Sequence, residues 1–154
     1  MAITVTATAT RFRAVLLLAV SFAGGAAVRA QNAPHPTESP LMRQVHQALS
    51  LAEHGNNQEA MNLVLRLLEQ KPDFVPALKL KGMLLEGAGR TSESAAVYEQ
   101  ALKLAPNDGD LLLKAGIYKL TAGQKEEALK LLQHCIRVLP GDGDAHYYLS
   151  RPIT

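Results

Sequence analysis

Two sets of residues recur along this chain with one shared period of 34 residues. They are three glycines and three prolines: Gly55, Gly89 and Gly123, then Pro72, Pro106 and Pro140. Glycine supplies the tight turn inside a helical hairpin, and proline ends a helix because it lacks an N–H group. A fixed period of this length is typical of stacked helical units. The spacing therefore predicts three consecutive helical hairpins over residues 41–142.

The composition agrees with an all-α fold. The chain has 154 residues, of which 47% are hydrophobic and 19% are charged, as expected of a folded domain rather than a disordered one. Only 5% are aromatic and Trp is absent, so Leu and Ala must form most of the core. Both residue types are strong helix formers. The single cysteine, Cys135, excludes an internal disulfide and a multi-cysteine zinc site, so packing alone must hold the fold.

The charge of the repeat region argues against a nucleic-acid partner. The net charge of the whole chain is +2. The first 30 residues contain Arg11, Arg13 and Arg29 and no acidic residue, which leaves 13 basic and 14 acidic residues in the remainder. A near-neutral body with interspersed signs lacks the basic surface that binds a phosphate backbone.

Residues 1–30 have the layout of a secretory signal peptide. Arg11 and Arg13 precede an apolar run over residues 14–20, and Val28 and Ala30 stand three and one residues before a cleavage point. We expect cleavage after Ala30 and export to the periplasm or the exterior. There are two alternatives: the segment stays uncleaved as a membrane anchor, or it is apolar by chance. An uncleaved anchor is the only membrane contact that we expect. Only 15 uncharged residues separate Arg13 from Arg29, fewer than the roughly 20 that a spanning helix needs.

A Pro-rich linker and the repeat units follow this segment. Residues 31–40 contain three prolines and little apolar mass, which is typical of an extended linker. The predicted units then occupy residues 41–74, 75–108 and 109–142, with a partial fourth unit or capping stub at 143–154. Pro152 cannot continue the helix of that last segment. We expect either a minimal cap of about two turns or an interrupted, longer array.

Each unit also carries small residues where its two helices meet, followed by a large residue four positions after the second of them. These are Ala48, Gly82 and Gly116 in the first helices, Ala60, Ser94 and Ala128 in the second helices, and then Val64, Tyr98 and Leu132. In this pattern the sequence resembles the tetratricopeptide repeat (TPR) family over about 100 residues. The resemblance implies a right-handed α-solenoid of helix-turn-helix repeats, with Gly82 and Gly116 allowing close helix approach.

The departures from the family pattern carry information as well. Gln44 and Gln47 occupy places that are usually large and apolar, as expected of an N-terminal unit with no neighbour on that side. In the third unit Lys119 replaces the expected aromatic residue, although the adjacent Tyr118 can cover part of that surface.

Residues that could support catalysis are not grouped in this sequence. Cys135 falls on a packing position of the repeat, and we interpret it as a buried, unreactive thiol. The neighbouring His134 points about 100° away from it on a helix, so the two side chains do not converge. The other histidines lack metal-ligand spacing. We therefore expect no enzyme activity, no metal site and no cofactor.

The family resemblance implies a concave groove lined by the first helix of each unit. Carried over by repeat position, the predicted groove residues are Val45, Leu49, Lys79, Met83, Leu113, Lys114, Ile117, Tyr147 and Tyr148, with Met42, His46 and Leu80 beside them. Most are apolar, and an exposed apolar patch in a concavity usually marks a binding site. The alternative is that this surface packs against further units or against the linker.

Some members of the family hold a peptide's C-terminal carboxylate with Lys, Asn and Arg. The matching positions here are Val45, Leu49, Leu80, Asp110 and Lys114, of which only Lys114 has the right type. We therefore expect an amphipathic or extended peptide with some acidic character, bound by a scaffold of a bacterial cell envelope. The alternative is the N-terminal part of a larger envelope assembly or secretion component, or of a repeat-bearing enzyme, with its activity elsewhere.

Overall fold

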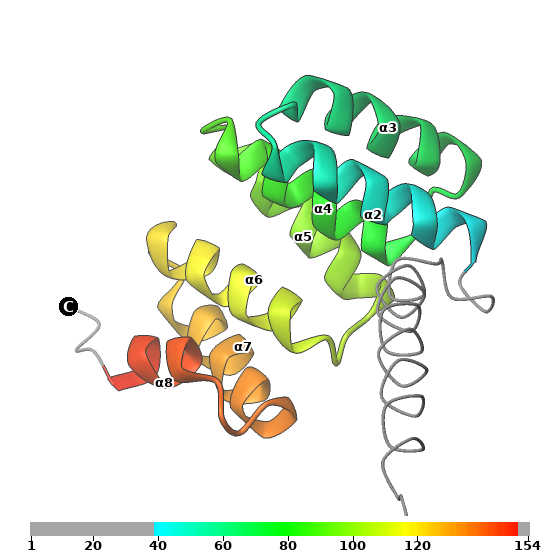
Figure 1. Ribbon diagram of the computed structural model, residues 1–154. Helices are drawn as coiled ribbons and strands as arrows, with labels where there is room; N and C mark the ends of the chain where they lie inside the picture. Colours follow the sequence, from blue (N-terminus) through cyan, green and yellow to red (C-terminus); the bar gives the residue numbers. More distant parts are fainter. Residues whose placement is uncertain (1–38, 151–154) are drawn as a thin grey trace, which may run out of the picture. The chain divides into compact units, whose positions relative to one another are not determined.

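The computed structural model describes residues 39–150. The predicted signal peptide and nearly all of the predicted linker lie outside these residues. The described part contains seven helices and no strand (Figure 1). The helices are α2 (Pro40–Glu53), α3 (Asn57–Gln70), α4 (Val75–Gly87), α5 (Thr91–Leu104), α6 (Gly109–Thr121), α7 (Lys125–Val138) and α8 (Gly143–Ser150). None of these helices is both long and apolar enough to cross a membrane.

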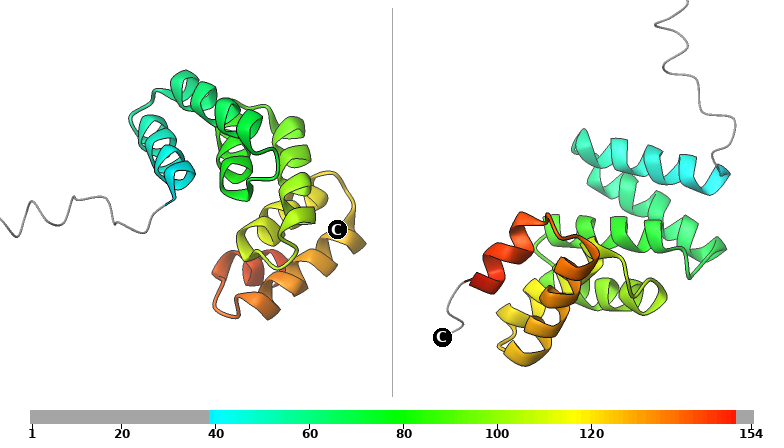
Figure 2. Two further views of the ribbon diagram at one scale, coloured as in Figure 1. Left: turned by 90° about the vertical axis from the view of Figure 1, so that its right-hand side faces the viewer. Right: turned by 90° about the horizontal axis from the view of Figure 1, so that it is seen from below.

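Three helical hairpins, α2–α3, α4–α5 and α6–α7, follow one another along the chain, and α8 comes last (Figures 1 and 2). The second helix of each hairpin packs against the first helix of the next: α3 contacts α4, α5 contacts α6 and α7 contacts α8. The first helices α2 and α4 also touch, as do α6 and α8. The chain is therefore an all-α helical-repeat solenoid.

The predicted turn glycines lie inside the three hairpins. Gly55, Gly89 and Gly123 have φ angles of 82°, 72° and 76°, a left-handed conformation that side chains with a Cβ rarely adopt. The residue after each glycine donates its N–H to the carbonyl five residues earlier, at 2.8, 2.9 and 2.8 Å. This is the 6→1 hydrogen bond of the Schellman motif, which closes a helix C-terminus. The prediction of glycine turns is confirmed.

The predicted prolines lie just beyond the second helix of each hairpin. Helices α3, α5 and α7 end at Gln70, Leu104 and Val138, and the proline follows two residues later in every case. Proline cannot donate to the preceding turn, so it stops the helix and starts the link to the next unit. The prediction that proline ends each second helix is confirmed.

The core consists of three apolar clusters, each formed by one hairpin together with the first helix of the next. Helix α4 divides its side chains between two of them. Leu80 and Leu84 pack in the first cluster with Val64 and Leu67 of α3. Leu78 and Leu85 pack in the second cluster, which also contains Tyr98 of α5 and Leu111 of α6. Because α4 is apolar on two sides, it connects successive units into one structure.

The third cluster is completed by α8. It contains Leu112 of α6, Cys135 of α7 and Ala145 of α8, each at most 1% exposed. Asp142 begins α8 by accepting a hydrogen bond from the Ala145 backbone N–H at 2.7 Å. An N-cap carboxylate of this kind satisfies a helix N–H that has no partner within the helix. Helix α8 therefore covers part of the third hairpin.

Candidate functional site

A groove runs along the first helices of the repeats. One part is a cavity of about 310 Å³ between α2, α4, α5 and α6. Its lining residues are Val45, Leu49, Pro76, Lys79, Leu80, Met83, Tyr98, Asp110, Leu111 and Lys114. A second hollow of about 340 Å³ shares Leu49 and Met83 with the first and adds Ala52, Glu53, Asn57, Leu84 and Gly87. We call these two adjacent hollows the groove.

Five of the nine predicted groove residues line this groove: Val45, Leu49, Lys79, Met83 and Lys114. The floor is apolar and well packed, since Leu80 is 5% and Tyr98 4% exposed. Met83 differs because it is 42% exposed while it lines both hollows. A flexible thioether in such a place adapts to the shape of an apolar ligand.

The other four predicted residues do not line the groove. Leu113 and Ile117 lie on α6 and are half-buried, and Leu113 packs against the third core cluster. Tyr147 and Tyr148 lie on α8, where their rings meet edge to face at 5.4 Å. Tyr147 is 52% exposed. The structure thus brings together the predicted groove residues of α2 and α4 with Lys114 of α6, and leaves Leu113 and the other three outside the groove.

Sequence reasoning missed Pro76, Tyr98 and Leu111 in the first hollow, and the residues that line only the second hollow, among them Glu53. Pro76 lies 34 residues before Asp110, so the repeat period applied to that position could have found it. Tyr98 belongs to a second helix, whose residues were expected to serve packing alone. Its ring reaches the groove floor because Gly82 leaves room beside it: a Cβ at Gly82 would lie 2.7 Å from two Tyr98 ring carbons.

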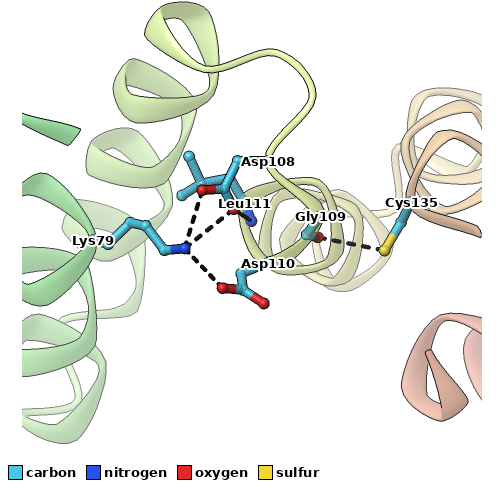
Figure 3. A network of polar contacts seen from close by, with 6 residues as sticks. All are labelled: Lys79, Asp108, Gly109, Asp110, Leu111 and Cys135. Atoms are coloured by element: carbon cyan, nitrogen blue, oxygen red, sulfur yellow. Dashed lines mark hydrogen bonds and ion pairs between the residues drawn. The ribbon is translucent and has the colours of Figure 1, made fainter. Parts of the chain in front are cut away.

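Lys79 of α4 forms ion pairs with two carboxylates at the start of α6. Its Nζ lies 3.1 Å from Asp108 and 2.7 Å from Asp110 (Figure 3). Burial lowers the pKa of Lys79, but the hydrogen bonds to Asp110 and Asp108 outweigh that effect and raise the pKa above its ordinary value. This lysine is therefore already engaged and does not present a free positive charge to the groove.

The first turn of α6 is held from two sides (Figure 3). Asp108 caps the helix by accepting a hydrogen bond from the Leu111 N–H at 3.1 Å, while it also binds Lys79. On the other side the Cys135 thiol of α7 donates to the Gly109 carbonyl at 3.4 Å. These contacts fix the groove wall that α6 provides.

Lys114, the second lysine of the groove, is also paired. Its Nζ donates to both carboxylate oxygens of Glu86 at 2.9 Å, linking α6 to the end of α4. The Tyr98 hydroxyl donates to the same carboxylate at 3.4 Å. Burial and the negative charge of Glu86 raise the pKa of Tyr98 well above its ordinary value, so the phenol stays neutral.

A buried hydroxyl continues this polar network into the interface between the second and third hairpins. Ser94, fully buried, donates to the Gly82 carbonyl at 2.8 Å and lies 3.1 Å from the Tyr118 hydroxyl. The rings of Tyr118 and Tyr98 stack with centroids 6.0 Å apart. Every buried polar side-chain atom within residues 39–150 has a hydrogen-bond partner. The network therefore positions Tyr98 without leaving an unsatisfied group.

Cys135 is fully buried, as predicted for a packing position. Burial raises the pKa of its thiol, with smaller effects from Asp142 and Asp110. A protonated thiol inside the core is a poor nucleophile. Among the described residues, no three His, Cys, Asp or Glu side chains are grouped so that they could hold a metal ion.

The sequence profile described as "Psidin, N-terminal TPR repeats region" matches residues 42–149. No curated protein matches the chain. Among solved structures, the first TPR of Spaghetti (RPAP3), bound to the HSP90 peptide SRMEEVD, is similar with a TM-score of 0.64 and 13% identity. The match covers 71% of this chain and 86% of that one. YrrB, described as a TPR protein with an unusual peptide-binding site, has a TM-score of 0.60 and 18% identity, covering 75% and 59%.

Two further solved structures have similar scores. MamA from Desulfovibrio magneticus RS-1 has a TM-score of 0.61 and 21% identity, and the match covers 71% of this chain and 62% of that one. An O-GlcNAc transferase from Thermobaculum terrenum has a TM-score of 0.60 and 24% identity, covering 73% and 22%. This chain spans less than two thirds of either protein. At these identities the likeness shows the fold.

Proposed function

This chain belongs to the tetratricopeptide repeat family, and we propose that it is a scaffold that binds a segment of a partner protein in the groove. The family generally serves as a non-catalytic scaffold, and the described residues form a hollow that a partner segment can enter. Two similar structures are described as binding a peptide or as having a peptide-binding site. Those likenesses support a protein or peptide as the ligand.

The exposure of Met83 within the groove is the observation that carries this proposal. Met83 lines both hollows and is 42% exposed. Leu65 of α3 is similarly exposed, at 40%, but does not line either hollow of the groove. When a ligand covers an apolar side chain that opens into a concavity, burial stabilises the complex by about 25 cal/mol for each Å² of apolar surface removed from water.

Site-specific photocrosslinking in cells of the native host tests the proposal. A photoreactive amino acid is placed at position 83 or, as the matched control, at position 65 of the full chain. We expect a discrete crosslinked adduct from position 83 and none of the same mass from position 65. Equal adducts from both positions, or none from position 83, would contradict binding in the groove.

We further propose that this scaffold works outside the cytoplasm, in a bacterial cell envelope. The proposal rests on the signal-peptide layout of residues 1–30. We expect the protein in the periplasmic or secreted fraction of its host, with Gln31 as the first residue by N-terminal sequencing. An intact Met1 N-terminus on the cellular protein, together with recovery from the cytoplasmic fraction, would refute export.

A further inference from the structure

We propose that the segment bound in the groove combines an aliphatic anchor with basic side chains, an inference that rests on the proposed function. The sequence alone predicted a ligand with some acidic character, because two lysines stand among apolar positions. The structure favours the opposite sign, because both lysines are already paired with carboxylates from neighbouring elements.

The charged groups of the groove have a negative sum. Those that line it or pair with a lining residue are two lysines and four carboxylates: Lys79 and Lys114, then Glu53, Glu86, Asp108 and Asp110. Asp108 is also the N-cap of α6, which offsets part of its charge. If Asp108 is left out of the sum, the three remaining carboxylates still outnumber the two lysines.

Two of the four carboxylates, Asp110 and Glu53, are open to solvent. Asp110 is 71% exposed at its side chain, against 31% for Lys79, whose single charge is shared between Asp110 and Asp108. Glu53 lines the second hollow and is exposed. A basic side chain of a ligand can therefore reach Asp110 or Glu53 without displacing a lysine, whereas an acidic one meets an excess of like charge.

The two carboxylates lie in different parts of the groove, with apolar surface between them. Asp110 lines the first hollow and Glu53 the second, and Met83 and Leu49 line both. This order fits a segment whose large aliphatic side chains cover Met83 and Leu49 while basic residues on either side reach the carboxylates. An amphipathic cationic helix or strand has this chemistry.

Selection from a displayed library of short random peptides, balanced for acidic and basic residues, tests the charge assignment. The full chain and its Met83→Glu variant are selected in parallel, and groove-dependent peptides are those enriched only on the unmodified chain. We expect these peptides to contain Leu, Ile, Met or Phe and to have a positive mean net charge.

The Glu53→Gln, Asp110→Asn double variant provides the electrostatic control. Both side chains are exposed, and circular dichroism should show unchanged helicity. Removal of two charges should weaken binding of a basic groove-dependent peptide roughly 3- to 10-fold and reduce the salt dependence of its affinity.

The outcomes separate this inference from the proposed function. Groove-dependent peptides that are neutral or acidic on average, or that bind the double variant as tightly as the unmodified chain, would overturn the inference and leave the scaffold function intact. A selection that yields no groove-dependent peptide would overturn both.

Discussion

Two glycines of α4 show how the role of a residue depends on what lies next to it. A Cβ at Gly82 would lie 2.7 Å from two ring carbons of Tyr98, which is only 4% exposed and stacked on Tyr118. A Cβ at Gly87, in the last turn of the same helix, would have no neighbour within 4 Å. Close packing therefore requires glycine at position 82 and tolerates a larger residue at position 87.

We expect Gly82→Ala to destabilise the protein and Gly87→Ala to leave it unchanged or slightly more stable. Overpacking against a fixed ring costs about 1–3 kcal/mol, which exceeds the gain of up to about 1 kcal/mol from the better helix propensity of alanine. The control variant, Gly87→Ala, has only the gain in helix propensity. The free energy of unfolding in urea measures both, and equal stability of the two variants would show that Gly82 is not a contact position.

The thiol of Cys135 should react only when the core opens. It is fully buried, donates to the Gly109 carbonyl and has a raised pKa. We expect labelling by a chromogenic disulfide reagent at pH 8 to be at least about 100-fold slower in the native protein than in urea, because exposure requires local or global unfolding. Native labelling as fast as that of the unfolded chain would contradict the burial described above.

At the scale of helices, α4 and α6 form the groove wall through charged side chains. Lys79 links α4 to the first turn of α6, and Lys114 links α6 to Glu86 near the end of α4. Tyr98 of α5 lines the first hollow and shares Glu86 with Lys114. The groove therefore depends on a set of protonated groups, two lysines and a phenol.

This dependence predicts a loss of stability at alkaline pH. The raised pKa of Tyr98 means that the unfolded chain loses this proton at about pH 10 while the folded chain keeps it. Stability from Tyr98 is thus complete below about pH 10 and falls as the pH rises further. The raised pKa of Lys79 acts in the same direction.

Tyr98→Phe should reduce the slope of the unfolding free energy against pH above about pH 10, measured by urea unfolding at several pH values. Tyr147→Phe is the matched control, because Tyr147 is 52% exposed. The control should have the slope of the unmodified protein. A slope unaffected by Tyr98→Phe would mean that burial does not hold the phenol neutral.

The sequence was sufficient to predict the hairpins and their turns because these depend on local chemistry repeated at a fixed period. The positive φ of Gly55 and the helix end before Pro72 follow from the residues themselves. The sign of the groove's charge could not be read in this way. It depends on pairs such as Lys79 with Asp110, 31 residues apart, which meet only after two hairpins have stacked.

For the molecule as a whole, the two sides of the first hairpin differ in character. A hollow of about 570 Å³ is lined by α2 and α3 alone, and its mostly polar lining includes Gln44, Gln47, Asn62 and Arg66. The equivalents of Gln44 in the next two units are Leu78 and Leu112, both buried. Apolar surface in the first hairpin is thereby directed toward α4 and the groove, which agrees with ligand binding there.

The most direct test of this account compares two glutamate substitutions at equally exposed apolar positions, Met83→Glu in the groove and Leu65→Glu on α3. Isothermal titration with a peptide selected on the unmodified chain alone, chosen without regard to its enrichment on Met83→Glu, gives the affinity of each variant. We predict roughly 10- to 100-fold weaker binding for Met83→Glu, because the new carboxylate must be desolvated against an apolar ligand, and unchanged affinity for Leu65→Glu. Equal affinities of the two variants would contradict the assignment of the groove as the binding site.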